Sequence, residues 1–171
     1  MIISVEEIKE LIEVNMTDKT LELKLKGLEN AIREYTNNNF QIRNARFQCS
    51  IKNGKLSTVL PPFTVGDTVQ ISKSLYNEGV YELEAIDGKL SEVLIDESLV
   101  TVTLVRYPKD IKAGVVDIIK WENSNRDKIG ISSETISRHS VTYSQPTGDN
   151  SVIGYPKELT TFLQPYMKAR F

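Results

Sequence analysis

The sequence predicts an α+β fold, a small α-helical bundle that carries an inserted antiparallel β-subdomain. In residues 1–40 and again in residues 108–171, apolar side chains recur at the three-to-four-residue spacing of amphipathic helices. Residues 41–107 are instead rich in β-branched and aromatic residues that alternate with polar ones. The hairpin-type dipeptides Asn53-Gly54 and Asp87-Gly88 fall in this middle stretch. We therefore expect the two outer parts to form one helical core and the middle part to be an insertion.

Two helices are predicted in the N-terminal part. Ser4 and Glu7 have the spacing of a capping box, which marks the start of the first helix. Thr17 or Asp18 should cap a second, longer helix that stops at Asn37-Asn38-Asn39. The predicted apolar stripe of this second helix contains Leu21, Leu25, Leu28, Ile32 and Tyr35.

The middle stretch predicts five or six short strands in a small antiparallel sheet or barrel. The segments that alternate most clearly are Thr68–Ile71, Val80–Ile86, Val93–Ile95 and Val100–Val105. Val65–Val69 resembles the opening strand of SH3-like barrels. Because the insertion leaves the helical core and returns to it, its two ends should lie close together.

A third helix should begin at Pro108, because the N–H group that proline lacks has no helical partner in the first turn. Its predicted buried stripe consists of Ile111, Val115, Ile118, Ile119 and the stem of Glu122. Gly114 interrupts this helix and suggests that another backbone passes close to it. The helix should end near Asn123–Asn125. The hydroxyl-rich residues 126–143 are then expected to form an exposed extended arm or one leg of a hairpin.

A last helix and a basic tail are predicted for residues 155–171. Pro156 should open the helix, and Pro165 should end or kink it near Gln164. Its apolar stripe has the spacing of a face that packs on the bundle. The end of the chain, Tyr166–Phe171, is expected to be available to a partner.

The composition indicates a globular protein made in the cytoplasm. The 171 residues are 40% apolar and 26% charged, and the net charge is −2. No apolar run of about 18 residues and no signal-peptide pattern is present, so neither a membrane span nor secretion is expected.

Nothing in the sequence predicts an enzyme or a cofactor site. His139 and Cys49 are the single histidine and the single cysteine, so neither a zinc site nor an intrachain disulfide is expected. There is no nucleophile elbow, no P-loop and no dinucleotide-binding glycine motif. The acidic residues of the middle stretch are expected at turns and strand ends rather than as a catalytic pair: Asp67, Asp87, Asp96 and Glu97.

The order of these parts resembles a known family. An apolar helix is followed by Gly130-Ile131-Ser132-Ser133-Glu134-Thr135-Ile136-Ser137 and Ser140-Val141-Thr142-Tyr143, then by a polar loop and a short proline-containing helix. Together with the two N-terminal helices, this pattern resembles the head–tail connector proteins of long-tailed bacteriophages, also called head-completion or adaptor proteins. The resemblance covers about Met1–Phe40 and Pro108–Phe171, and the β-insertion lies outside the minimal family pattern.

The resemblance implies a structural protein of the virion neck that is assembled in the host cytoplasm. Identical subunits would form a ring, a dodecamer in the family, that docks beneath the portal protein after genome packaging. The ring would complete the head, extend the DNA channel and offer a platform to the next neck or tail protein. DNA would be non-specific cargo only, and no cofactor and no membrane would be involved.

Contacts with the neighbouring subunit and with the portal are expected from the arm and the tail. The residues proposed for these contacts are Ile129, Ile131, Ile136, Arg138, Val141, Tyr143, Tyr166, Arg170 and Phe171. Leu23 joins them, because it lies nearly opposite the buried stripe of the second helix and could meet a neighbouring subunit.

Two alternatives remain open from sequence. One is a nucleic-acid-binding regulator whose β-insertion is an SH3-like or OB-like reader. Residues 47–107 carry 5 basic and 8 acidic side chains, a balance of −3, which argues against such a surface. The other alternative is a different neck or tail-completion protein, and the residue pattern does not separate it from a connector.

Overall fold

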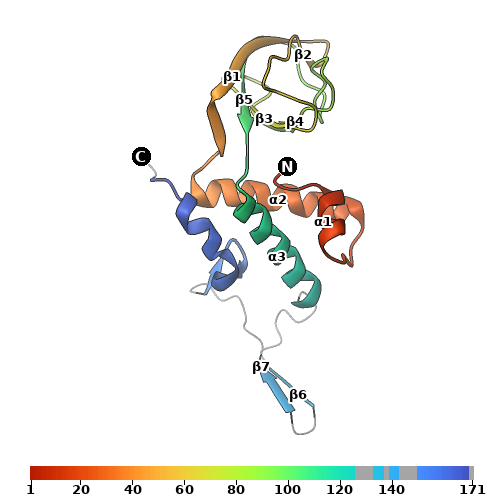
Figure 1. Ribbon diagram of the computed structural model, residues 1–171, viewed down its shortest axis with the longest axis vertical. Coiled ribbons are helices and arrows are strands. Elements are labelled where there is room, and N and C mark those ends of the chain that lie inside the picture. Colours follow the sequence, from red (N-terminus) through yellow and green to blue (C-terminus); the bar gives the residue numbers. More distant parts are fainter. Residues whose placement is uncertain (126–132, 137–138, 143–149, 170–171) are drawn as a thin grey trace. The chain divides into compact units, whose positions relative to one another are not determined.

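The structure is a computed structural model that combines helices with antiparallel sheet, so the α+β prediction is confirmed (Figure 1). It describes residues 1–125, 133–136, 139–142 and 150–169. Its contacts divide the chain into two compact units. The β unit contains Met1 and Asn39–Tyr107, and the helical unit contains Ile2–Asn38 and Pro108–Phe171.

Local capping sets the start of the first helix, α1 (Val5–Leu11). The Ser4 hydroxyl accepts a hydrogen bond from the Glu7 N–H at 3.1 Å, and the Glu7 carboxylate accepts one from the Ser4 N–H at 3.3 Å. This is the predicted capping box, in which two N–H groups without a helical partner are satisfied. Val5 and Ile8 form the buried side of this short helix.

The second helix, α2 (Asp18–Thr36), begins and ends where the sequence indicates. Thr17 is the N-cap, and Asn37 closes the helix in the left-handed conformation with a φ of 48°. The predicted stripe is buried at Leu21, Leu25, Leu28 and Ile32, and Tyr35 is half-buried.

The third helix, α3 (Lys109–Asn125), is buried along its predicted stripe. Pro108 immediately precedes the helix, and its carbonyl accepts a hydrogen bond from the Lys112 N–H at 3.2 Å. The buried residues of α3 are Ile111, Gly114, Val115, Ile118, Ile119 and Glu122.

The C-terminal helix differs in type from an ordinary α-helix. Strands β8 (Ser151–Val152) and β9 (Tyr155–Pro156) pair with each other and lead into η2 (Lys157–Tyr166), a 3-10 helix. Pro165 lies inside η2 and has no N–H to donate, which removes one α-helical bond. The helix nevertheless continues to Tyr166, beyond the end predicted near Gln164.

The β unit is a curled, half-barrel sheet of five antiparallel strands. The strands are β1 (Gln41–Lys52), β2 (Lys55–Leu56), β3 (Thr68–Ser72), β4 (Gly79–Glu82) and β5 (Glu97–Val105). Their order across the sheet is β2-β1-β5-β3-β4, so β2 and β4 are the edges. The predicted Asn53-Gly54 turn joins β1 to β2, and both of its residues have positive φ, as this hairpin turn requires.

The core of the β unit lies inside the curl and extends under the loop that follows β4. Its buried members are Ala45, Cys49, Ile51, Leu56, Phe63, Val69, Ile71, Leu83, Leu90, Leu94, Val100, Val102 and Leu104. Leu83 and Leu90 form an isolated bridge, and the Leu56 N–H donates to the Gly88 carbonyl at 3.0 Å. The loop after β4 therefore links the two edges of the sheet.

In this loop region one strand prediction was wrong, and another was only partly right. Val93–Ile95 is not a strand, although Leu94 between them is buried. The Leu94 N–H donates to the Gly54 carbonyl at 3.3 Å, and the Ile95 N–H donates to the Asn77 side chain at 2.8 Å. These bonds satisfy the backbone without a ladder. The predicted Val80–Ile86 strand is shorter in the structure, since β4 ends at Glu82.

The two ends of the β unit lie side by side. The Arg106 N–H donates to the Phe40 carbonyl at 3.0 Å, and the rings of Phe40 and Tyr107 are 5.0 Å apart. The β unit therefore begins and ends at nearly the same place, as expected for an insertion.

Candidate assembly surfaces

The predicted arm contains a short hairpin. Strand β6 (Ser133–Ile136) pairs antiparallel with β7 (His139–Thr142), in the register Ser133↔Thr142 to Ile136↔His139. Within the described part of the chain, these two strands form a sheet of their own and pair with no other strand. The hairpin therefore offers outer edges that a further strand can join.

Several predicted contact residues are not described by the structure. Ile129, Ile131, Arg138 and Tyr143 of the arm lie outside the described residues, as do Arg170 and Phe171 at the end of the tail. Ile136 and Val141 lie in β6 and β7, where position 136 pairs with His139 and position 141 with Glu134.

The tail, by contrast, is attached to the end of α2. The Lys168 N–H donates to the Thr36 carbonyl at 2.8 Å, and the Asn37 side chain donates to the Ala169 carbonyl at 2.8 Å. Asn38 adds a bond to the Tyr166 carbonyl at 3.1 Å and accepts one from the Lys168 ammonium at 2.7 Å. The tail as far as Ala169 is thus held by Thr36, Asn37 and Asn38 at the end of α2, rather than being the free end expected from sequence.

Tyr166 is fixed at both ends. Its backbone is bonded to Asn38, and its hydroxyl donates to the carboxylate of Asp110 at the start of α3. The hydrogen bond to Asp110 raises the pKa of the Tyr166 hydroxyl, because that bond exists only while the hydroxyl keeps its proton, and the negative charge of Asp110 adds to the rise. Tyr166 is therefore held in place within the helical unit, and a partner would bind it in this fixed position.

A buried acid ties three elements of the helical unit together. Glu122 of α3 accepts a hydrogen bond from the Tyr155 hydroxyl of β9 at 2.9 Å and pairs with the Lys24 ammonium of α2 at 2.5 Å. Burial raises the pKa of the Glu122 carboxyl, and the Tyr155 hydrogen bond offsets part of that rise. Trp121 packs edge-on against the Tyr155 ring at 6.0 Å. The stem of Glu122 completes the stripe as predicted, while its head serves as a polar anchor.

Leu23 lies on the outer side of α2 and is 73% exposed, as the sequence indicates. It is available for a contact, but it is a single side chain.

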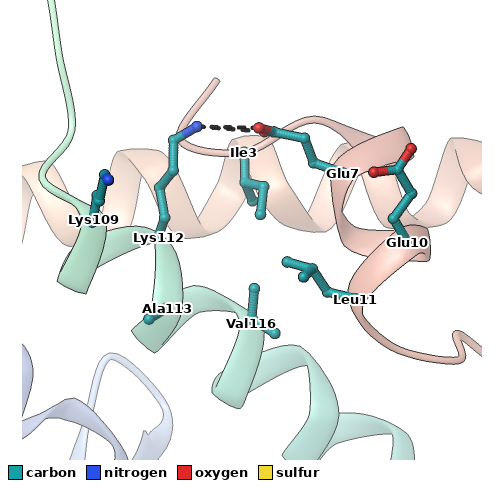
Figure 2. A pocket seen from close by; sticks show the side chains of 8 residues that line it. All are labelled: Ile3, Glu7, Glu10, Leu11, Lys109, Lys112, Ala113 and Val116. Carbon is teal, nitrogen blue, oxygen red and sulfur yellow. Dashed lines mark hydrogen bonds and ion pairs between the residues drawn. The ribbon is translucent and has the colours of Figure 1, made fainter.

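A groove runs between α1 and α3 (Figure 2). It has a volume of about 360 Å³, and its apolar floor is made by Ile3, Leu11, Ala113 and Val116. Glu7 and Glu10 stand on the α1 side, and Lys109 and Lys112 stand on the α3 side. One ion pair crosses the groove, from the Lys112 ammonium to the Glu7 carboxylate at 3.4 Å. This arrangement suits an apolar segment that carries opposite charges at its two ends.

Comparison of the sequence with protein-family models and with curated proteins finds no match in either. None of the helices in the described ranges is long and apolar enough to cross a membrane.

The β unit exposes several large apolar side chains, and three of them belong to two segments that Asn77 joins. Leu75 and Tyr76, in the loop between β3 and β4, are 83% and 65% exposed, and Ile95 is 57% exposed. Asn77 is buried and joins the two segments, because its side chain bonds the Ile95 carbonyl at 2.9 Å and the Ile95 N–H at 2.8 Å. We call Leu75, Tyr76 and Ile95 the apolar tip.

The loop that carries the apolar tip is held by side chains. The Ser74 N–H donates to the Glu78 carboxylate at 3.1 Å, and the Leu75 N–H donates to the Glu97 carboxylate at 2.9 Å. The N–H groups of Tyr76 and Asn77 both donate to the Ser74 hydroxyl, at 3.3 and 2.7 Å. Glu97 also accepts from the Ser74 hydroxyl at 2.5 Å. These bonds lower the pKa of the Glu97 carboxyl, the Ser74 hydroxyl most of all. The loop is therefore fixed in one shape before any partner arrives.

The three aspartates of the β unit also stabilise turns. Asp96 accepts from the Gly54 N–H at 3.0 Å, Asp87 accepts from the Lys55 ammonium at 2.6 Å, and Asp67 accepts from the Thr64 N–H at 2.7 Å. Among the described residues, no cluster of His, Cys, Asp and Glu could hold a metal ion. Cys49 is buried, and burial raises the pKa of its thiol.

A second hollow of about 410 Å³ lies on the polar side of the sheet. Its lining residues come from β1, β3, β5 and the start of the β3–β4 loop: Gln41, Arg46, Phe47, Gln48, Ser72, Lys73, Thr101 and Thr103. The charged members are Arg46 and Lys73, so the hollow is weakly basic within an otherwise acidic unit.

The sequence did not indicate the groove or the apolar tip. The groove depends on how α1 packs beside α3, which no local pattern encodes. The tip had a visible signal, since Leu75-Tyr76 places two large apolar residues inside a turn. Turns are normally polar, so such a pair is a reason to look for a contact.

Proposed function

We propose that this protein is a connector of the neck of a long-tailed bacteriophage, a ring-forming subunit between portal and tail that completes the packaged head. The observation that carries the proposal is the β6–β7 hairpin, which pairs with no other described strand. A two-stranded hairpin is marginally stable in water. It gains stability when a neighbouring chain extends its sheet, so the hairpin is typical of a protein that works in an assembly.

A ring follows from the kind of contact that such a hairpin makes. The hairpin of one subunit would bind a different surface of the next subunit, which is a heterologous contact. Repeated around an axis, heterologous contacts close into a ring. The portal would act as the template, and the next neck or tail protein would bind the free face of the ring.

The charge of the chain suits a DNA channel. The net charge is −2, so few phosphate contacts would hold a moving genome in place. DNA is then cargo that passes through the ring, and no cofactor takes part.

The proposal is tested with packaged, portal-bearing heads prepared without this protein. Added protein should bind these heads, prevent loss of DNA and allow tails to join, and electron microscopy should show a ring at the portal vertex. The same protein should not bind capsids that lack the portal. Failure to bind portal-bearing heads under conditions in which the protein is folded would contradict the proposal.

The basic hollow on the sheet favours a second candidate, a nucleic-acid-binding module. Arg46 and Lys73 could contact two phosphates there, while neighbouring glutamine and threonine side chains could contact sugar or base. Two cations give only a weak electrostatic contribution, so we expect no specific duplex binding at physiological salt. A submicromolar affinity in a gel shift, lost in Arg46→Gln and steeply dependent on salt, would favour this second candidate over the connector.

A further inference from the structure

The basic hollow gathers polar side chains from β1, β5 and β3, the central strands of the sheet, on one face. Thr103 of β5 pairs with Arg46 of β1. Thr101 of β5 pairs with Gln48 of β1 on one side and with Ser72 of β3 on the other. Residues directly opposite each other in an antiparallel ladder have their side chains on the same face. The backbone pairing therefore brings these side chains together, and all of these residues line the hollow.

The two cations of the hollow have no acidic partner among the described residues. Each ion pair within the β unit involves Lys55 or Lys89, neither of which lines the hollow. None of the lining residues is acidic. Two cations beside one hollow attract an anion, and a shared anion also offsets the repulsion between them. Arg46 and Lys73 therefore favour an anionic ligand.

The backbone holds Lys73 at the rim of the hollow. Lys73 follows β3 with a left-handed φ of 59°, which is uncommon for lysine. The next two N–H groups are bonded to carboxylates, that of Ser74 to Glu78 and that of Leu75 to Glu97. These carboxylates bind the loop and do not line the hollow. The backbone around Lys73 is thus fixed in advance, which lowers the entropy cost of binding.

Thr103 supplies a hydroxyl group that a ligand can use. The residue is 4% exposed and lines the hollow, and its hydroxyl has no hydrogen bond to another described residue. The nearby bond from the Gln48 amide to the Thr101 hydroxyl is 3.5 Å long, which is weak. A buried hydroxyl without a partner costs free energy. A ligand that accepts a hydrogen bond from Thr103 would remove that cost.

We propose that the basic hollow binds a phosphate group, which Arg46 and Lys73 hold together and to which the Thr103 hydroxyl donates. Phosphate oxygens accept strong hydrogen bonds from guanidinium and ammonium groups. The three donors come from β1, from the end of β3 and from β5, which suits a tetrahedral phosphate better than a flat carboxylate.

The size of the hollow limits what carries the phosphate. Its volume of about 410 Å³ is within the range of small-molecule sites, and a DNA duplex is too wide to enter it. The ligand is therefore a nucleotide, either free or as part of a single strand. The inference concerns the hollow of the second candidate function, and it does not depend on the connector role.

Nuclear magnetic resonance tests the site in the full chain. Thymidine monophosphate, thymidine and a short oligothymidine are titrated separately into isotope-labelled protein. We expect thymidine monophosphate to shift the amide signals of Lys73, Thr101 and Thr103 until they saturate, and thymidine to leave them unchanged. Tighter binding of the oligothymidine would identify single-stranded nucleic acid as the source of the phosphate, and tighter binding of the monophosphate would identify a free nucleotide. No saturable shift at these amides with either phosphate ligand would overturn the inference.

A pair of charge variants separates the site from general attraction. Arg46→Gln should weaken the binding of thymidine monophosphate about tenfold, because one charge-assisted bond is lost. Arg43→Gln is the matched control, since Arg43 is an exposed cation of the same strand that does not line the hollow. It should leave the affinity unchanged. Equal weakening in the two variants would show that the protein attracts phosphate only through its overall charge, and the site would be wrong.

Thr103→Val distinguishes a ligand contact from a structural role. Valine has nearly the shape of threonine and removes a hydroxyl that has no partner in the described chain, so the melting temperature should be equal or higher. Binding of thymidine monophosphate should nevertheless weaken several-fold. A lower melting temperature with unchanged binding would contradict the assignment of Thr103.

The connector proposal is judged by a different measurement. If the parental protein completes portal-bearing heads but does not bind thymidine monophosphate, the phosphate site is wrong and the connector proposal stands. If it binds thymidine monophosphate in the hollow but does not bind such heads, the phosphate site stands and the connector proposal is wrong.

Discussion

Gly114 of α3 lies directly against the ring of Phe162 in η2. A β-carbon at position 114 would be 2.3 Å from the nearest ring carbons, which is too close for any real contact. The sequence suggested that another backbone passes close to Gly114, and that interpretation was wrong, because the neighbour is an aromatic side chain. The glycine allows η2 to pack closely on α3.

Gly114→Ala should therefore destabilise the helical unit, although alanine is the better helix former. The ring of Phe162 would have to move away from α3, and such overpacking costs about 1–3 kcal/mol. Thermal unfolding followed by circular dichroism measures the effect. Gly27→Ala in α2 is the control: nothing lies within 4 Å of its added β-carbon, so it should stabilise the protein by about 0.5–1 kcal/mol. Equal melting temperatures for the two variants would contradict this account.

The Lys24–Glu122 pair should respond differently to single and double substitution. Glu122→Ala leaves the Lys24 ammonium and the Tyr155 hydroxyl facing a cavity, so we expect a loss of about 3 kcal/mol in unfolding free energy. Replacing both members of the pair, with Lys24→Met and Glu122→Leu, should cost less than Glu122→Ala, because no charge is left unpaired and only the Tyr155 hydroxyl loses this bond. Urea unfolding measures both. A double variant as unstable as the single one would show that the ion pair is not the reason for the loss.

Features encoded by neighbouring residues were predicted well. The caps at Ser4 and Thr17, the stripe of α3 and the Asn53-Gly54 turn each depend on a few adjacent positions. The longest strand, β1, was not singled out, because Arg43, Asn44 and Arg46 interrupt its apolar alternation. Its place is fixed by pairing with β5, which follows some fifty residues later in the chain.

The errors have the same origin. Val93–Ile95 has the composition of a strand, but Gly54 and Asn77 supply its backbone partners from distant parts of the chain. The tail after Tyr166 looks unattached in sequence, because nothing local shows that Thr36 and Asn37 will bond to it. Candidate surfaces built from two distant segments, such as the α1–α3 groove, are beyond local patterns for the same reason.

Glu97 should make the stability of the β unit depend on pH. Its pKa is lower in the folded state, so its contribution is present above the ordinary glutamate pKa of about 4.3 and is lost as the pH falls through the folded value. Glu97→Gln should therefore lower the urea midpoint at pH 7, and the difference from the parental protein should shrink toward pH 3. Glu92→Gln, an exposed site in the same unit, should leave the midpoint unchanged at both pH values. A Glu97→Gln difference that is the same at pH 3 and pH 7 would rule out this explanation.

Removal of the β-insertion should leave a folded helical unit. The Arg106 N–H lies 3.0 Å from the Phe40 carbonyl, so a short Gly/Ser linker can replace Ile42–Arg106. The stripes of α2 and α3 lie in the helical unit and should remain buried. We expect cooperative helical unfolding by circular dichroism. A gradual, non-cooperative loss of helix would mean that the insertion is part of the core.

The hairpin arm should matter for assembly and not for the fold. Positions 136 and 141 share one face of the hairpin, since Ile136 pairs with His139 and Val141 lies two residues further along β7. The arm has few large apolar residues. Ordering its backbone costs about 1–2 kcal/mol per residue, against about 1.5–3 kcal/mol for each buried apolar side chain. The net free energy of ordering the arm is therefore near zero in the isolated chain. Without a template the arm should not hold subunits together, so we expect a mostly monomeric protein in solution.

Ile136→Asp combined with Val141→Asp should therefore leave the melting temperature of the monomer nearly unchanged. A subunit or portal that adds contacts would tip the balance toward binding, and two buried aspartates would remove that gain. The variant should fail to attach to portal-bearing heads, which would then leak DNA or remain without tails. Ile86→Asp, at an exposed apolar site of the β unit, tests whether any added exposed charge has the same effect. If the double variant unfolds the monomer, the arm belongs to the core. If it folds and still completes heads, the arm is a solvated loop and the ring must be held by other contacts.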